Sequence, residues 1–225
     1  AQQVYSNRYT HYFATNVLSG LRIGFYQHSS VARDLLTVLF EQLGATVIPL
    51  GRTNEFVPLD TEAVAPADVV RAKEWANEYK FDAIISTDGD ADRPLIGDGS
   101  GHWLRGDIVG ILCAQYLQAQ AVATPVSCNT SVEKCGHFAK VSRTRIGSPY
   151  VIAEMEQLQA DGFSNIVGFE ANGGFLLGSD IVKNNTTLVA LKTRDATLPM
   201  LAILTMAKQK GCKVSELIKY LPARF

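Results

Sequence analysis

Three aspartates at alternate positions, followed directly by an arginine, are the residues of this sequence best suited to do chemistry. They lie in the segment Asp88-Gly89-Asp90-Ala91-Asp92-Arg93. Carboxylates this close in sequence repel one another, and a hard divalent cation such as Mg²⁺ or Ca²⁺ removes that conflict because it takes oxygen ligands. The small spacers let the backbone fold tightly around an ion. The spacing therefore predicts a metal-binding loop, with a solvated acidic turn as the alternative.

The residues around the aspartates distinguish two kinds of metal loop. The Asp-x-Asp-x-Asp spacing matches the first half of an EF-hand calcium loop. In the second half, Arg93 stands where the EF-hand needs glycine, and Gly99 stands where it needs a bidentate glutamate. The apolar residues 83–85 also predict a buried strand before the loop, not a helix. Because Arg93 is a fixed cation suited to phosphate, a Mg²⁺ loop for phosphoryl transfer is the better interpretation.

A second polar loop follows the strand predicted for residues 165–169. It contains Glu170, Asn172, Gly173 and Gly174. The carboxylate and the amide offer acceptor and donor groups for adjacent hydroxyls, as on a sugar. Glycine lets the backbone approach a ligand closely. For the two glycines taken alone, a plain hairpin turn is the alternative.

The two loops together resemble those of the α-D-phosphohexomutases, the phosphomannomutase/phosphoglucomutase superfamily. DGDADR resembles the metal loop of that family, and GFEANGG at residues 168–174 resembles its sugar-recognition loop, Gly-Glu-x-Ser-Gly-His. The resemblance covers nearly the whole chain and implies domains II and III of the family. It implies that Asp88, Asp90 and Asp92 bind Mg²⁺ and that Arg93 is a catalytic residue. It also implies that Glu170, Asn172 and Gly173 bind the substrate.

The resemblance also implies an activity and the partners it needs. The family interconverts hexose 1-phosphate and hexose 6-phosphate through a bisphosphorylated sugar, so the full-length protein would be a Mg²⁺-dependent intramolecular phosphotransferase, an isomerase of carbohydrate metabolism. An N-terminal phosphoserine domain and a C-terminal phosphate-binding domain take part in that chemistry. We expect the present chain, without them, to be inactive as a mutase. The loop departs from the family pattern at Asn172, where serine is usual, and at Gly174, where histidine is usual.

Arg145 is a further candidate for binding the phosphosugar. It precedes a helix predicted to begin with Ser148 as cap and Pro149 at its first position. A helix N-terminus beside arginines favours an anion, and the family places a Thr-Gly-His segment near the phosphosugar at this point. A solvated arginine is an equally good interpretation of the spacing alone.

The pair His28-Ser29 invites a nucleophile interpretation. No partner that would orient the histidine is visible, so we favour Ser29 as a helix cap. The family's phosphoserine lies in a Ser-His-Asn-Pro context, which this sequence lacks. The helix that follows is predicted to bury five apolar residues: Val31, Leu35, Val38, Leu39 and Leu43.

The elements that must position these loops alternate between strands and helices, which predicts an α/β fold. We expect two tandem three-layer α/β domains of similar topology, with mixed sheets flanked by helices. Residues 1–119 would form the metal-binding domain and residues 120–225 the sugar-binding domain. Strands are expected at residues 21–26, 45–50, 83–85, 121–126, 138–142 and 165–169, and long helices at 3–18, 107–119 and 197–210.

Composition excludes several classes of function. The 225 residues fit two domains, and 21 basic against 22 acidic residues give a net charge of −1. That balance gives no electrostatic case for nucleic acid or an anionic membrane. We expect no membrane-spanning segment and, without a signal pattern, a cytoplasmic protein with reduced cysteines. The rival function is a non-catalytic module that binds Mg²⁺ and a sugar phosphate. A Mg²⁺-dependent phosphatase would need a nucleophilic aspartate on the strand at 21–26, which has none.

Overall fold

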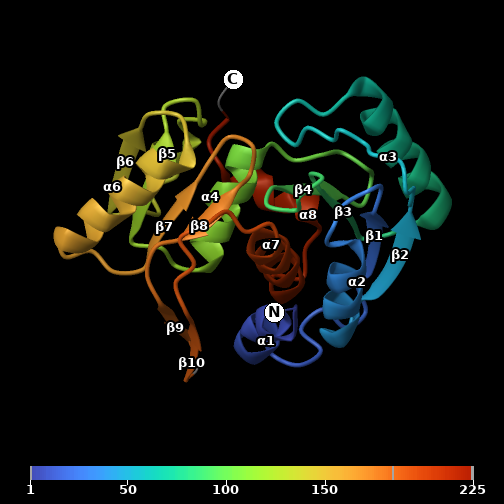
Figure 1. The fold of residues 1–225 in the computed structure, drawn as a ribbon, viewed down its shortest axis with the longest axis horizontal. Helices are drawn as coiled ribbons and strands as arrows, with labels where there is room; N and C mark the ends of the chain where they lie inside the picture. The colour runs from blue at the N-terminus through green and yellow to red at the C-terminus, as the bar shows by residue number, and fades with distance from the viewer. Residues whose placement is uncertain (1, 184, 224–225) are drawn as a thin grey trace.

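The computed structural model describes residues 2–183 and 185–223, and it confirms the expected α/β fold. Two four-stranded mixed sheets lie side by side with helices on their faces (Figure 1). Their strand orders, β2-β1-β3-β4 and β6-β5-β7-β8, are equivalent. In each sheet three strands run parallel and the fourth pairs antiparallel at one edge. The two units therefore repeat one topology, as predicted.

The carboxylate loop lies at the carboxyl end of a central strand of the first sheet. The strands of this sheet are β1 (Arg22–Tyr26), β2 (Thr46–Leu50), β3 (Ala83–Thr87) and β4 (Pro94–Asp98). Every residue of β3 is buried, because helices cover both faces of the sheet. Helix α2 (Arg33–Gln42) adds Leu36, Leu39 and Phe40 to the core that contains Ile23, and α3 (Pro66–Tyr79) packs on the other face.

The second sheet carries the glycine-containing loop in the equivalent position. Its strands are β5 (Ala121–Pro125), β6 (Lys140–Thr144), β7 (Ile166–Phe169) and β8 (Phe175–Leu177). Short helix α5 (Ser131–Lys134) and helix α6 (Ser148–Ala160) connect them. A small hairpin, β9 (Ile181–Lys183) and β10 (Thr186–Leu188), follows the sheet. None of β8, β9 and β10 was predicted, because strands of three residues are too short to show a period.

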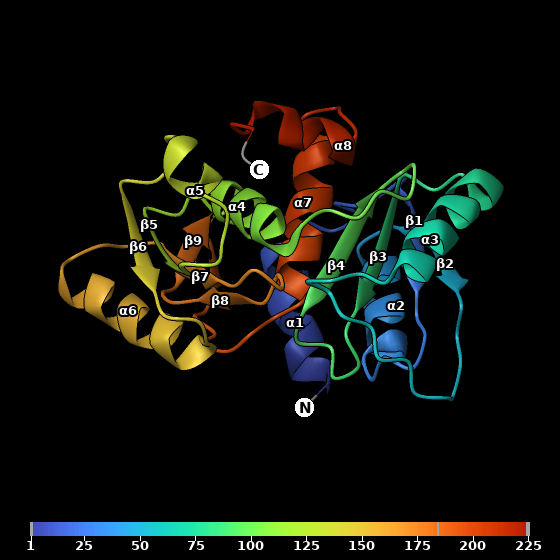
Figure 2. The same ribbon diagram turned by 90° about the horizontal axis from the view of Figure 1, so that it is seen from above.

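Helix α7 (Thr197–Gln209) lies between the two sheets (Figure 2), and its residues from Thr197 to Ala207 are all buried. It packs on α4 (Gly106–Tyr116) and on β4, so one hydrophobic core runs through both units. Helix α1 (Gln2–Tyr12) lies against α2 and β10, and α8 (Val214–Leu217) with a 3₁₀ turn (Ile218–Tyr220) follows α7. The division of the chain at residues 119 and 120 stays a prediction.

Four local predictions were wrong. Helix α1 ends at Tyr12 instead of residue 18. Helix α2 begins at Arg33, and its buried stripe differs from the predicted one, so Val31 and Val38 are 76% and 52% exposed. Ser29 does not cap α2, because its hydroxyl accepts a hydrogen bond from the backbone N–H of Val57. Ser148 is the first residue of α6, and Gly147 precedes it as the cap.

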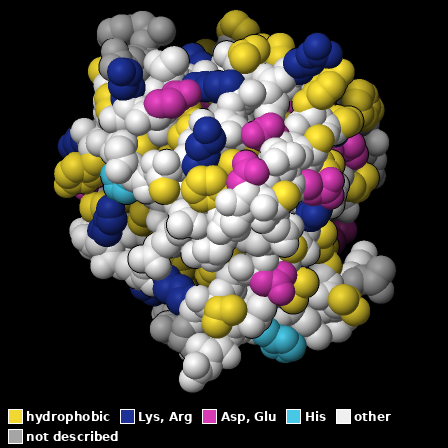
Figure 3. Space-filling model, turned by 90° about the vertical axis from the view of Figure 1, so that its left-hand side faces the viewer, with side chains coloured by type: hydrophobic (Ala, Val, Ile, Leu, Met, Phe, Trp, Pro, Cys, Tyr) yellow, Lys and Arg dark blue, Asp and Glu magenta, His cyan; other side chains and the backbone are white. Residues whose placement is uncertain are grey.

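The described helices are each too short or too polar to span a bilayer. On the face of the second unit seen in Figure 3, basic and acidic side chains are interspersed among apolar and uncharged ones. That face carries no broad patch of one charge, in keeping with the net charge of −1.

Candidate functional site

The carboxylate loop is a tight turn that joins β3 to the antiparallel strand β4. Thr87 at the end of β3 pairs with Pro94 at the start of β4. Within the loop, Oδ1 of Asp88 accepts backbone hydrogen bonds from Asp92 and Arg93, each at 3.1 Å. Ala91 has a left-handed backbone with φ of 63°, which closes the turn. Asp88 therefore organises the loop through Oδ1, while Oδ2 lies beside Arg93.

The geometry of the three aspartates suits a cation. One carboxylate oxygen from each of Asp88, Asp90 and Asp92 lies within 4.8 Å of the others. Burial raises the pKa of Asp88 to about 6, and the negative charges of the other two aspartates act in the same direction. Oδ1 of Asp92 is buried without a hydrogen-bond partner among the described residues. These oxygens fit a hard divalent ion, which would neutralise the repulsion and satisfy the orphaned atom.

Arg93 lies at the edge of the same loop. Its Nε is 3.5 Å from Oδ2 of Asp88 and 3.6 Å from Oδ1 of Asp92, and the side chain is 36% exposed. These separations are too long for good hydrogen bonds, so the guanidinium is held by charge. The remaining N–H groups of the guanidinium are potential donors to an anion.

The loop between β7 and β8 is held by its own backbone. Glu170 N–H donates to Gly174 O at 3.0 Å, and Gly173 N–H donates to Glu170 O at 3.0 Å. Gly173 has φ of 90°, a conformation that favours glycine. Oδ1 of Asn172 accepts from Gly174 N–H at 2.9 Å, and this contact uses neither N–H donor of the Asn172 side-chain amide. The loop is thus held by hydrogen bonds among its own residues.

Glu170 is the buried charge of this loop. It is 6% exposed, and its Oε2 has no hydrogen-bond partner among the residues described. Burial raises the pKa of Glu170, and the positive charges of Arg194 and Arg93 oppose that shift. A buried carboxylate oxygen without a partner is the kind of group that a ligand hydroxyl satisfies.

The structure brings the two loops into contact, and Arg194 joins them. Its Nε lies 2.9 Å from Oδ2 of Asp92, and its Nη1 lies 3.8 Å from Oε2 of Glu170. Thr61 strengthens the junction, because its hydroxyl donates to Asn172 O at 2.7 Å. Neither Arg194 nor Thr61 was among the predicted site residues. The glycine at position 174 was the signal available in the sequence, because the missing side chain leaves space that another residue must fill.

Arg145 lies apart from this junction. It follows β6, which is separated from β7 by β5 in the sheet, and its guanidinium lies 5.8 Å from the ring centroid of Tyr150. No described contact links it to the two loops. A phosphate-binding role for Arg145 stays a prediction.

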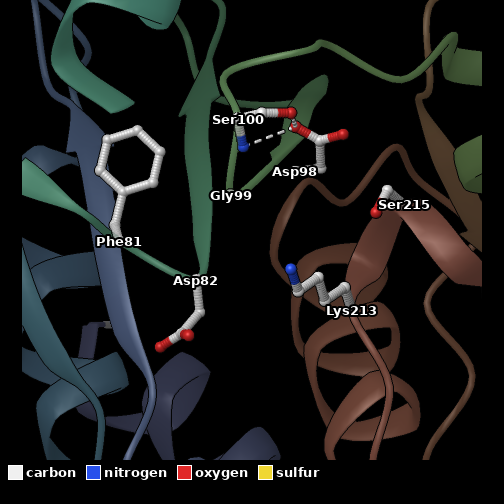
Figure 4. Close-up of a pocket in the computed structure, with 7 residues that line it drawn as sticks. All are labelled: Phe81, Asp82, Asp98, Gly99, Ser100, Lys213 and Ser215. Atoms are coloured by element: carbon white, nitrogen blue, oxygen red, sulfur yellow. Dashed lines mark hydrogen bonds between the residues drawn. The ribbon is translucent and has the colours of Figure 1, made fainter. Parts of the chain in front are cut away.

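A cavity of about 330 Å³ lies at the opposite end of strands β3 and β4 from the carboxylate loop (Figure 4). Phe81 and Asp82 precede β3, Asp98 ends the antiparallel β4, and Gly99 and Ser100 follow it, so these residues lie at the other end of the two strands from the carboxylate loop. Asp98 accepts hydrogen bonds from both the backbone and the hydroxyl of Ser100. Its carboxylate thus shapes the turn, and the cavity is no part of the candidate site.

His28 lies buried beside β3, where its Nε2 is 2.8 Å from Thr87 O. Burial lowers the pKa of His28, and Arg33 acts in the same direction, whereas the contact with Thr87 and the charge of Asp68 oppose the shift. The unfolded chain, with an ordinary histidine pKa of about 6.5, then takes up the proton first as the pH falls. Stability contributed by neutral His28 is therefore lost as the pH drops below about 6.5.

We expect a His28→Gln variant to lose less stability than the wild type as the pH is lowered from about 7.5 to about 5. Glutamine keeps a donor for Thr87 O but has no titrating group in this range. Urea unfolding at several pH values measures the effect, and the difference between the two chains cancels the contributions of other groups. Parallel stability curves for the two chains would contradict the prediction.

Two family models match the sequence along nearly its whole length. Residues 3–101 match the phosphoglucomutase/phosphomannomutase alpha/beta/alpha domain II, and residues 105–225 match the alpha/beta/alpha domain III. A phosphomannomutase of Salmonella muenchen is 55% identical over 225 residues, which are 100% of this chain and 46% of that protein.

Solved structures share the fold at lower identity. A phosphoglucomutase/phosphomannomutase family protein of Burkholderia thailandensis superposes with a TM-score of 0.72 at 15% identity, over 100% of this chain and 47% of that one. An Aspergillus fumigatus N-acetylphosphoglucosamine mutase, solved in complex with GlcNAc-6P and magnesium, gives 0.65 at 16% identity, over 99% of this chain and 54% of that one. The chain thus spans about half the length of the relatives it matches.

Proposed function

The chain belongs to the phosphoglucomutase/phosphomannomutase family, and on that premise we propose that it carries the metal-binding and sugar-binding parts of a hexose-phosphate mutase. The full-length protein would interconvert hexose 1-phosphate and hexose 6-phosphate through a bisphosphorylated sugar. One observation carries the proposal, namely that Arg194 spans Asp92 of the carboxylate loop and Glu170 of the second loop. A ligand with a phosphate and adjacent hydroxyls would touch both loops at once.

We assign Mg²⁺ to Asp88, Asp90 and Asp92. The clustered oxygens and the buried, unpartnered Oδ1 of Asp92 support this assignment. When bound, Mg²⁺ supplies positive charge that stabilises a transferring phosphoryl group. Arg93 adds a guanidinium at the rim of the loop, where it can contact phosphoryl oxygens and hold the group in place.

Glu170 and Asn172 hold the sugar in this proposal. The unpartnered Oε2 of Glu170 accepts a hydroxyl hydrogen bond, and the amide of Asn172 donates to a neighbouring hydroxyl oxygen. Gly173, whose backbone is left-handed, leaves room for the ring to approach the loop. Gly174 offers no group that could transfer a proton, so that step falls to another residue.

The partners in this chemistry are a phosphosugar and two further domains of the same protein. The chain covers 46% of the phosphomannomutase of Salmonella muenchen, so the rest of that relative has room for two more domains. We propose a phosphoserine domain and a phosphate-binding domain for the full-length protein. The phosphoryl carrier would be the serine of that first domain. A cytoplasmic location stays a prediction.

A coupled assay of the full-length protein tests the proposed function. We expect Mg²⁺-dependent conversion between the 1-phosphate and 6-phosphate of mannose or glucose in the presence of the hexose 1,6-bisphosphate. The 225-residue chain under the same conditions should show no turnover above the buffer blank, because it lacks the carrier and the second phosphate site. A full-length protein that binds Mg²⁺ and hexose phosphate without turnover would instead support the non-catalytic binding module.

In the full-length protein, Glu170→Ala should lower kcat/KM at least about tenfold, which corresponds to about 1.4 kcal/mol of lost transition-state binding. The reason is that the carboxylate holds sugar hydroxyls which alanine cannot contact. Glu74→Ala, at an exposed position of α3, removes the same charge away from the site and serves as the control. Wild-type kinetics in a well-folded Glu170→Ala protein would count against the assignment.

A further inference from the structure

The space beside Gly174 is filled by the side chain of Arg194. A Cβ atom built on Gly174 would lie 2.6 Å from Cδ and 2.9 Å from Cγ of Arg194, distances that real Cβ atoms do not show. Unlike Gly173, Gly174 has an ordinary backbone conformation, so the need for glycine here comes from space. Gly174 and Arg194 therefore form a matched pair, 20 residues apart in the sequence.

The backbone on either side of Arg194 is fixed. Leu191 pairs with Leu177 of β8 through two backbone hydrogen bonds, and Asp195 N–H donates to Phe175 O at 2.9 Å. The carboxylate of Asp195 is buried and accepts hydrogen bonds from the hydroxyls of Tyr5 and Tyr9. Arg194 thus lies three residues before α7, the helix that runs between the two sheets in Figure 2, and its backbone is held by hydrogen bonds of the residues on either side.

The charges around Arg194 give it two opposed interactions. On one side it pairs with Asp92, whose carboxylate also belongs to the candidate metal site. On the other side it is the nearer of the two cations that compensate the buried Glu170. A cation beside a metal ligand weakens metal binding by repulsion, whereas a cation beside a buried carboxylate keeps that carboxylate in place.

We propose that Arg194 is a positioning residue that holds Glu170 in its sugar-binding position while competing with the metal ion for Asp92. This inference rests on the proposed function, since it assumes that the two loops bind one ligand. The side chain of Arg194 fills the space beside Gly174, where the family usually has histidine. Arg194 acts there as a fixed cation and not as a proton-transfer group. Arg194 would thereby balance the metal affinity of one loop against the sugar-phosphate affinity of the other.

Binding measurements on the 225-residue chain test this inference without any turnover. Mn²⁺ is titrated by water-proton relaxation, and glucose 6-phosphate in the presence of Mg²⁺ is titrated by NMR chemical shifts. For Arg194→Gln we expect Mn²⁺ affinity to rise about fivefold, because the competing cation is gone. Glucose 6-phosphate affinity should fall about tenfold, because Glu170 loses the cation that compensates its charge.

Two further variants separate charge from geometry. Arg194→Lys keeps the charge but cannot reach both carboxylates with one planar group, so Mn²⁺ affinity should stay within about twofold while glucose 6-phosphate binds more weakly. Gly174→Ala should displace the guanidinium and reproduce the Arg194→Gln result. Lys140→Gln, exposed at the start of β6, removes one positive charge at the far edge of the second sheet and should change neither affinity.

The outcomes distinguish this inference from the proposed function. A wild-type chain that binds neither Mn²⁺ nor glucose 6-phosphate contradicts the proposed function itself. If the wild-type chain binds both, the Arg194→Gln variant tests the role of Arg194 alone. Two affinities that move in the same direction, or that do not change, overturn that role. A merely structural residue would weaken both. If Arg194→Gln does not fold, unchanged glucose 6-phosphate binding in Arg194→Lys overturns the inference.

Discussion

Replacing Asp90 with alanine is expected to lower the affinity of the chain for Mn²⁺ at least about 30-fold, equivalent to about 2 kcal/mol. Asp90 contributes one of three carboxylate oxygens that lie within 4.8 Å of one another. It accepts no hydrogen bond from the described residues that would make it a structural group. Asp88, in contrast, organises the loop through two backbone hydrogen bonds, so its removal would mix folding with binding.

The same substitution should make the metal-free chain slightly more stable. The charge of Asp90 is one of the causes that raise the pKa of Asp88, which shows that the two carboxylates repel in the absence of an ion. Removing one of them relieves that repulsion. Loss of metal affinity together with a higher midpoint of urea unfolding is a signature that general damage to the fold cannot produce.

Relaxation titration with Mn²⁺ and urea unfolding in EDTA measure the two effects. Glu55→Ala is the matched control, because it removes one negative charge from an exposed position outside the carboxylate loop. An Asp90→Ala chain that binds Mn²⁺ as tightly as the control would remove the three-aspartate assignment. A drop in stability of the metal-free variant would show that Asp90 is a structural residue of the turn.

The parts of the site that were predictable from sequence are those encoded within a few residues. The carboxylate loop follows a fully buried strand, and the apolar run before Asp88 was visible in the sequence. The Glu170 loop follows its strand in the same way. In both cases the spacing along the chain determines the neighbours in space, so local reasoning was sufficient to propose roles for these residues. Those roles stay predictions until the binding and kinetic experiments test them.

The parts that could not be predicted depend on contacts between distant segments. Arg194 reaches Asp92 across about one hundred residues of sequence, and its position depends on the anchoring of Asp195 by Tyr5 and Tyr9 of the first helix. No period or local pattern in the sequence encodes such a contact. The error at α2 has a similar cause, because several apolar residues could form its buried stripe, and only the packed sheet selects Leu36 over Val38.

Helix α4 begins directly beneath the Glu170 loop, at Gly106. A Cβ atom on Gly106 would lie 2.3 Å from the backbone nitrogen of Gly173, 2.4 Å from the carbonyl oxygen of Ala171 and 2.6 Å from the carbonyl carbon of Asn172. All three are backbone atoms, which cannot turn aside as the end of a flexible side chain can. A methyl group at this position must therefore displace either the loop or the start of the helix.

Gly106→Ala is accordingly expected to destabilise the chain by about 3 kcal/mol, the upper part of the range for overpacking. It should also weaken glucose 6-phosphate binding, because it moves the loop that carries Glu170 and Asn172. Helix propensity alone predicts the opposite sign, since alanine is favoured over glycine by up to about 1 kcal/mol. The sign of the change in unfolding free energy therefore decides between packing and propensity.

Gly110→Ala, one turn further along α4, is the matched comparison. Its Cβ would lie 2.3 Å from Cγ of the buried Phe169, so it clashes with a core ring and not with the loop backbone. Both variants should unfold at lower urea concentrations, measured by circular dichroism. At urea-free conditions where both are folded, glucose 6-phosphate binding should fall more in Gly106→Ala than in Gly110→Ala. Equal stability of Gly106→Ala and the wild type, or equal loss of binding in the two variants, would refute the view that α4 supports the sugar loop through close contact at Gly106.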